Sequence, residues 1–195
     1  MRGKLIVFEG LDGAGITTQA TLLRNYFLTK KRTVVLTKEP TEGLLGGIIK
    51  SCLRGEWKTD ATTLQTLFSA DRSHHLNTEI NPAVKQGKIV ICDRYVLSSI
   101  VYGSLNAPLE LLKSLNERFA KPDLQIFVDT QPSICIQRMR QARHHVELFE
   151  EEQKLVQIRK NYLAMRNFFP NTRIVDGNRS AEDVMREIQT LVTDY

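Results

Sequence analysis

Short apolar runs of strand length alternate with helix-length segments along the chain, and this alternation is the strongest constraint on its fold. Five runs are predicted strands: Lys4–Glu9, Thr33–Thr37, Lys88–Asp93, Leu124–Asp129 and Arg173–Asp176. They are apolar almost throughout, as expected of parallel strands buried on both faces. The predicted helices are Thr18–Thr29, Leu44–Arg54, Ala61–Gln86 with a break near Pro82, Val96–Ser104, Pro108–Ala120, Pro132–Gln141, Glu150–Phe168 and Ala181–Val192. The alternation predicts a three-layer α/β fold, in which helices flank a five-stranded parallel sheet.

The composition predicts one soluble globular domain over residues 1–195. The apolar fraction is 42% and the charged fraction 25%, which are ordinary values for such a domain. No apolar run approaches the roughly 20 residues that span a bilayer, and the first ten residues predict a strand and not an export signal. Three widely spaced cysteines without a C-x-x-C pair indicate reduced thiols in a cytoplasmic protein, and a zinc site is not expected.

The formal net charge of +5 favours anionic partners, either nucleic acid or the phosphates of nucleotides. The basic residues are scattered, apart from Lys30–Arg32 and the arginines between Arg138 and Arg143. Because no basic stripe is interleaved with aromatic residues, we expect small phosphate ligands and no nucleic acid.

A glycine-rich stretch, "FEGLDGAGITTQ", lies between the first predicted strand and the first predicted helix. It matches the phosphate-binding pattern G-x-x-x-x-G-K-[ST] except at one position, where Ile16 replaces the lysine. Backbone N–H groups and a helix N-terminus can hold phosphates without that lysine, and the Thr17 hydroxyl can bind Mg²⁺. The predicted cofactor-binding residues are Gly10, Leu11, Asp12, Gly13, Ala14, Gly15, Ile16, Thr17 and Thr18. The alternative is that the loop only connects a strand to a helix.

The missing lysine predicts slower catalysis more than weaker binding. A charged hydrogen bond contributes about 1.5–3 kcal/mol, so its loss slows phosphoryl transfer by roughly 10- to 150-fold if no other cation compensates. Transition-state charge is where such a group contributes most.

Further motifs make the sequence more specific. In chain order the motifs are "FEGLDGAGITTQATLL", "VVLTKEPTEG", "LQTLFSADRSHHL", "PAVKQGKIVICDRYVLSSIVY", "KPDLQIFVD" and "IVDGNRSAEDVMREI". Their order and spacing resemble the thymidylate kinase family from about Lys4 to Ile188. The resemblance implies a P-loop NTPase fold with a short lid, and transfer of the ATP γ-phosphate to dTMP with Mg²⁺, giving dTDP and ADP.

The strand-end residues Asp93 and Arg94 are the predicted catalytic centre. Asp93 suits a water-mediated Mg²⁺ contact, and Arg94 can lie between the donor and acceptor phosphates as a bidentate clamp. From local sequence alone, the alternative is that the pair is only an ion pair at a strand end. In the family that the chain resembles, both positions are catalytic.

The resemblance also assigns the acceptor site. Phe68 and Arg72, four residues apart on one helix face, correspond to the platform that stacks on thymine and the donor to its 4-oxo group, although Phe68 by itself would be read as a core residue. Ser98 and Ser99 correspond to contacts with the pyrimidine edge, and Tyr102 lies against the sugar.

Three further residues are assigned to the acceptor site by resemblance. Asp12 corresponds to an acid near the acceptor's phosphate and sugar, or else caps the loop's own N–H groups. Glu39 is expected near the sugar, and Pro40 shapes the loop.

The stretch from Gln137 to Glu152 resembles a mobile lid, at about residues 138–152. Because the phosphate loop carries no arginine, the resemblance places the catalytic arginine in this lid. Arg140 and Arg143 are the catalytic candidates, and Arg138 is assigned to cofactor binding near adenine. Each could instead belong to a solvated basic helix end.

The sequence thus predicts a thymidylate kinase that is slowed by Ile16. Two alternatives remain: a catalytically silent nucleotide-binding module, and a kinase with relaxed choice among monophosphate acceptors. A homodimer is expected by resemblance, and neither a membrane nor a nucleic acid is expected as a partner.

Overall fold

A computed structural model of the chain describes residues 2–142, 148–193 and 195. Its described part contains one sheet built from β1 (Lys4–Gly10), β2 (Val34–Lys38), β3 (Ile89–Asp93), β4 (Leu124–Asp129) and β5 (Thr172–Asp176). All neighbouring strands are parallel, in the order β2-β3-β1-β4-β5. The predicted α/β fold with a five-stranded parallel sheet is therefore confirmed, and each strand lies within about one residue of its predicted bounds.

The helices follow the predicted alternation. They are α1 (Ile16–Thr29), α2 (Leu44–Leu53), α3 (Ala61–His75), α4 (Asn81–Lys85), α5 (Val96–Gly103), α6 (Leu109–Asn116), α7 (Pro132–Ala142), α8 (Leu148–Ala164) and α9 (Ala181–Leu191). None of the described helices combines the length and the apolar character that a membrane span needs.

The predicted break near Pro82 is wrong. The chain stays helical from α3 into α4, and the two are joined by a π-helical turn over Leu76–Ile80. Pro82 lies in the first turn of α4. The π-helical turn directly before α4 already departs from the i→i−4 pairing of an α-helix, so a residue that has no N–H group to donate is accommodated there without a break.

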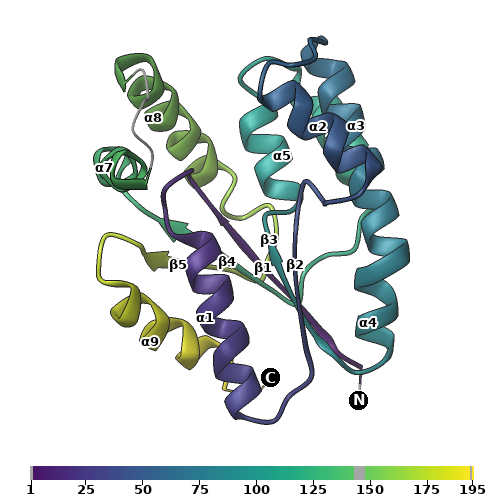
Figure 1. The fold of residues 1–195 in the computed structure, drawn as a ribbon, viewed down its shortest axis with the longest axis vertical. Coiled ribbons are helices and arrows are strands. Elements are labelled where there is room, and N and C mark those ends of the chain that lie inside the picture. Colours follow the sequence, from purple (N-terminus) through teal and green to yellow (C-terminus); the bar gives the residue numbers. More distant parts are fainter. Residues whose placement is uncertain (1, 143–147, 194) are drawn as a thin grey trace.

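Both faces of the sheet are covered (Figure 1), which explains the continuous apolar strands. Helices α1 and α9 lie on one side, and α3, α4 and α5 lie on the other. Along β1, Ile6 and Phe8 belong to the first apolar cluster, whereas Leu5 and Val7 belong to the second. Alternate residues of β1 thus pack into the clusters on opposite faces of the sheet. This packing fixes the position of the strand's carboxyl end, where the phosphate loop begins.

Candidate active site

The loop between β1 and α1 has the backbone of an anion-binding site. Gly13 and Gly15 adopt φ values of 80° and 92°, which other residues adopt only with strain. A Cβ atom on Gly13 would lie 2.5 Å from the Cys135 carbonyl oxygen. Helix α1 starts at Ile16, so its first-turn N–H groups point out of the helix toward the loop.

These N–H groups face a cavity of about 480 Å³, which we call the phosphate cavity. Loop residues between Leu11 and Thr18, except Ala14, line it together with Lys38, Arg94 and Arg138. Three cationic side chains therefore reach this cavity from β2, from the end of β3 and from α7, although the loop itself supplies none.

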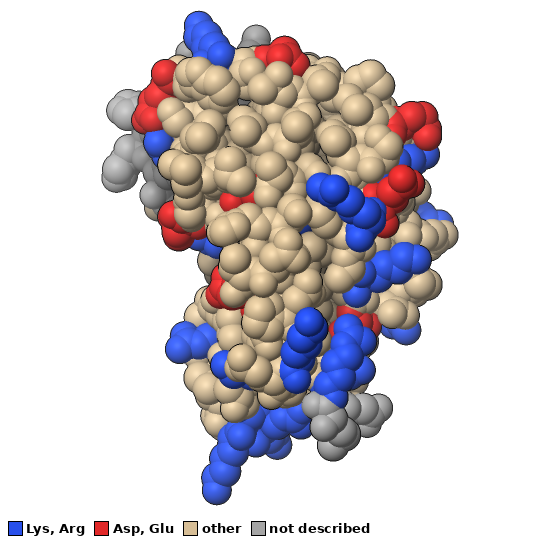
Figure 2. All heavy atoms as spheres, turned by 90° about the vertical axis from the view of Figure 1, so that its right-hand side faces the viewer, with Lys and Arg blue, Asp and Glu red and all other residues tan. Residues whose placement is uncertain are grey.

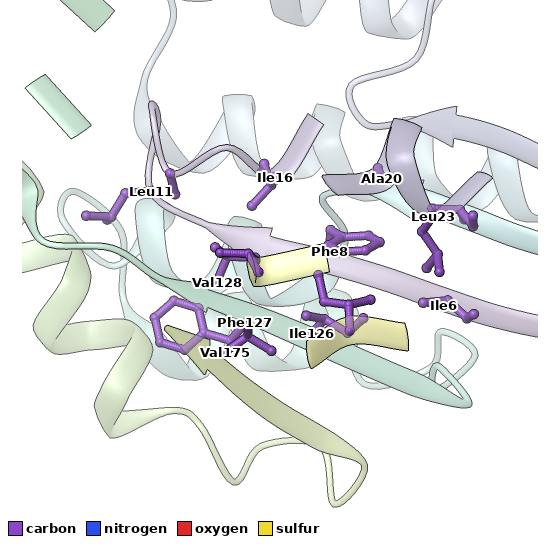
Figure 3. Close-up of a cluster of buried hydrophobic side chains, with 14 of the residues drawn as sticks. Ile6, Phe8, Leu11, Ile16, Ala20, Leu23, Ile126, Phe127, Val128 and Val175 are labelled. Atoms are coloured by element: carbon purple, nitrogen blue, oxygen red, sulfur yellow. The ribbon is translucent and has the colours of Figure 1, made fainter. Parts of the chain in front are cut away.

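Ile16 does not fill the phosphate cavity. Its side chain is directed toward the sheet, on the side of Phe8 and Val128 (Figure 3), and only 5% of the residue is exposed. A Cβ atom on Gly10 would come within 2.9 Å of the Ile16 Cγ2 atom. The isoleucine thus completes the core beneath the loop, and the cavity stays open above it.

Thr17 and Asp93, the predicted Mg²⁺ ligands, meet beside the phosphate cavity. The Thr17 hydroxyl donates a hydrogen bond of 2.5 Å to Asp93 Oδ2, and both residues line the cavity. A hydroxyl and a carboxylate are the hard oxygen ligands that Mg²⁺ prefers, so this pair fits a site for that ion next to bound phosphates.

Arg94 lies between two cavities. Its Nη1 donates to the Gly10 carbonyl oxygen at 3.0 Å and to Ser98 Oγ at 3.2 Å, and its Nη2 donates to Asp12 Oδ1 at 2.6 Å. Its guanidinium lies 5.2 Å from the centre of the Tyr102 ring. The backbone is strained, with φ of 70°, as is common where a functional side chain must be aimed.

The second cavity, of about 300 Å³, is called the acceptor cavity here. All the residues predicted to bind the acceptor line it: Asp12, Glu39, Pro40, Phe68, Arg72, Arg94, Ser98, Ser99 and Tyr102. Phe68 is half-buried and lies outside the apolar clusters of the sheet, which favours the platform over the core interpretation. Asp12, Glu39 and Arg94 line both cavities.

Ser98 and Tyr102 are also bound to other parts of the site. Ser98 Oγ contacts the Glu9 carboxylate and lies 2.8 Å from Tyr162 Oη, and the Tyr102 hydroxyl accepts from the Asp12 N–H group at 3.1 Å. Asp12 therefore pairs with Arg94 and Tyr102, and the described contacts do not include the capping of its own loop.

Glu9, the last residue of the first predicted strand, organises the start of α5. Glu9 Oε1 accepts hydrogen bonds from the N–H groups of Tyr95 and Ser98, and Oε2 accepts one from Tyr162 Oη at 3.2 Å. Burial raises the pKa of this carboxyl group. The carboxyl group links β1, α5 and α8, and so holds the backbone from which Arg94 projects.

Arg72 is fully buried at the base of the acceptor cavity. It donates to Glu39 Oε2 at 2.8 Å and to Ser99 Oγ at 2.9 Å, and it also contacts Asn116 Oδ1. Its guanidinium lies 5.1 Å from the centre of the Tyr95 ring and 5.6 Å from that of the Phe119 ring. Glu39 was predicted to lie near the sugar, and in the structure its carboxylate holds Arg72.

The predicted lid arginines have different places. Arg138 Nη1 lies 3.4 Å from the Ala14 carbonyl oxygen and lines the phosphate cavity. Arg140 is exposed and lines neither of the two cavities. Arg143 lies outside the described residues, as does part of the lid expected at residues 138–152.

Asn116 and Tyr162 could not be found from the sequence, because they join the site from distant segments and carry no motif. His75, which binds the other oxygen of Glu39 at 3.1 Å, did carry a signal. It follows Arg72 by three residues and so shares its helix face.

Comparison with known proteins agrees with this geometry. The family model described as "Thymidylate kinase" matches residues 8–188. A protein of Pyrococcus horikoshii named "Probable thymidylate kinase" is 38% identical over 198 residues, which covers 98% of this chain and 97% of the relative. A protein of Caldicellulosiruptor saccharolyticus named "Thymidylate kinase" is 33% identical over 204 residues, covering 100% of this chain and 98% of the relative.

Proposed function

Because the chain belongs to the thymidylate kinase family, we propose that it transfers the γ-phosphate of ATP to dTMP and forms ADP and dTDP. The observation that carries the proposal is the junction of the two cavities. Asp12, Glu39 and Arg94 line both of them, so a triphosphate on the glycine loop and a monophosphate beside Phe68 would meet at Arg94.

Positioning and charge neutralisation carry the reaction, and no covalent enzyme intermediate is required. The loop N–H groups hold the donor phosphates, and Arg94 clamps donor and acceptor phosphates in line. Mg²⁺, held by Thr17 and by Asp93 through water, would neutralise charge on the donor phosphates when bound. Phe68 stacks on the thymine ring, and Arg72 donates to its 4-oxo group.

Ile16 makes this a slow kinase in our proposal. Acceptor binding stays close to normal, since Phe68, Arg72, Arg94 and Tyr102 all line the acceptor cavity. Phosphoryl transfer is impaired, because the loop offers no cation to the phosphates. Arg138 lies near the loop, where it binds ATP, and Arg140 or Arg143 would complete the site on closure of the lid.

The test is prolonged incubation of concentrated protein with ATP, Mg²⁺ and dTMP, with products separated by chromatography. We expect equal amounts of dTDP and ADP, and an Arg94→Met variant should lose the activity while it keeps its fold. Nucleotide binding without dTDP formation would identify a silent binding module. Comparable turnover of dUMP, dCMP or dGMP would identify a kinase with relaxed acceptor choice.

We further propose a cytoplasmic homodimer. The face over α2 and α3 carries few charged side chains in its upper part (Figure 2). Leu44, Leu53 and Trp57, in and after α2, are exposed. Light scattering coupled to size-exclusion chromatography tests the dimer, and a particle of 22.3 kDa, the mass of one chain, would refute it.

A further inference from the structure

His75, the last residue of α3, belongs to a buried polar cluster behind the acceptor cavity. Its Nδ1 atom lies 3.1 Å from Glu39 Oε1, and its Nε2 atom lies 2.8 Å from Thr37 Oγ1 and 3.2 Å from Glu79 Oε2. The side chains of His75, Glu39 and Arg72 are at most 3% exposed. A buried histidine with partners on both ring nitrogens has a fixed ring orientation.

The ion pair between Glu39 and Arg72 does not by itself stop the Glu39 carboxylate from rotating. Arg72 places both Nε, at 2.8 Å, and Nη2, at 2.7 Å, on the same carboxylate oxygen, Oε2. A parallel two-oxygen pairing would fix the planes of both groups, but a pairing through one oxygen lets the carboxylate turn about that contact. The contact from His75 to Oε1 is what stops this rotation.

The chemistry of the two groups decides which of them carries the proton in the contact between His75 and Glu39. An ionised carboxylate only accepts hydrogen bonds, so His75 Nδ1 carries the proton and donates it to Glu39. The opposite nitrogen, Nε2, faces the Thr37 hydroxyl on β2. His75 thus connects Glu39 rigidly to the edge of the sheet.

A metal ion is the alternative occupant of this cluster. Glu39, His75 and Cys92 could together offer three ligand atoms within 4.8 Å of one another. A metal would need the Cys92 thiolate, yet the Cys92 thiol donates to the Arg94 carbonyl oxygen at 3.1 Å. It would also have to displace the hydrogen bond between His75 and Glu39. The contacts therefore favour a hydrogen-bonded support over a metal site.

We propose that His75 is a positioning residue for recognition of the pyrimidine base. It fixes the Glu39 carboxylate, Glu39 fixes the Arg72 guanidinium, and Arg72 presents a donor to the 4-oxo group of the acceptor. The inference rests on the proposed function, because it takes a 4-oxo pyrimidine monophosphate as the ligand. Arg72 has donors for it: the contacts above use one Nη1 hydrogen, toward Asn116, and leave the second Nη1 hydrogen without a partner among the described residues.

The experiment compares dissociation constants for dTMP and dUMP, which carry a 4-oxo group, with that for dCMP, which carries a 4-amino group. Calorimetry measures them for the unmodified protein and for His75→Leu, His75→Asn and His75→Gln. An Asn amide can replace Nδ1 toward Glu39, whereas a Gln amide can replace Nε2 toward Thr37. The exposed neighbour supplies the matched control, His74→Leu.

We expect His75→Leu and His75→Gln to weaken dTMP and dUMP binding roughly tenfold, as for a lost hydrogen bond to a charged group, and to leave dCMP binding nearly unchanged. His75→Asn should restore most of the discrimination. In steady-state assays KM for dTMP should rise, with kcat at saturation changing less than twofold.

The proposal is wrong if His75→Leu weakens the binding of dTMP, dUMP and dCMP equally, or if His75→Asn loses as much dTMP affinity as His75→Gln. One equivalent of zinc in the purified protein would also overturn it. If the unmodified protein binds dTMP and discriminates against dCMP but forms no dTDP, the proposed kinase activity fails and the positioning role is still measurable.

Discussion

Replacing Ile16 by lysine should raise kcat substantially and leave KM for dTMP almost unchanged. A lysine at the start of α1 would place an ammonium group in the phosphate cavity, which already holds Lys38 and Arg138. A charged hydrogen bond to a phosphate contributes about 1.5–3 kcal/mol, which corresponds to an increase in kcat of roughly 10- to 150-fold. Because Lys38 and Arg138 already bring positive charge to the cavity, we expect the increase in kcat to lie in the lower part of this range. KM for dTMP should stay the same, because Ile16 does not line the acceptor cavity.

The same substitution should destabilise the fold. Ile16 is 5% exposed and belongs to the core beneath the loop, and burial of an isoleucine contributes about 1.5–3 kcal/mol. The stem of a lysine can retain part of that contact, so we expect Tm to fall by roughly 3–6 °C. Steady-state kinetics with ATP and dTMP, together with a thermal melt, measure both effects.

Ile16→Met is the matched control, since methionine has a straight chain like that of lysine but no charge. It should lose less stability than Ile16→Lys, because it remains apolar, and show no gain in kcat. If Ile16→Lys and Ile16→Met have the same kcat, position 16 does not limit phosphoryl transfer and the reasoning from charge fails.

Two further substitutions test the loop and the buried acid. Gly13→Ala should lower the free energy of unfolding by about 1–3 kcal/mol and weaken ATP binding, because at a φ of 80° its Cβ atom would lie 2.5 Å from the Cys135 carbonyl oxygen. Gly47→Ala in α2 is the matched control: a Cβ atom there meets nothing within 4 Å, so the free energy of unfolding should rise by about 0.5–1 kcal/mol. Both are read from urea denaturation, and equal effects of the two would refute the steric argument. For Glu9, burial raises the pKa from 4.5, so its contribution to stability is complete below pH 4.5 and is lost as the pH rises through the raised pKa. Glu9→Gln should therefore gain stability relative to the unmodified protein between pH 5 and pH 8, and a difference that does not change with pH would contradict this.

The convergence of the site residues could be predicted because parallel strands present their carboxyl ends at one edge of the sheet. Asp93 at the end of β3 and Thr17 after β1 had to meet there, and the pairing of Phe8 with Asp93 in the sheet register brings them together. The acceptor residues on α3 and α5 could be assigned because their helical spacing and the family motifs agreed.

The sequence by itself determined the alternation of strands and helices and the glycine loop, because these depend on local periodicity and on short motifs, and the family motifs assigned the acceptor residues. Only the tertiary structure decided that Ile16 turns into the core and leaves the cavity open, and that Glu39 binds Arg72 and His75. Side-chain direction and buried hydrogen bonding depend on which distant segments pack together, and no local pattern carries that information.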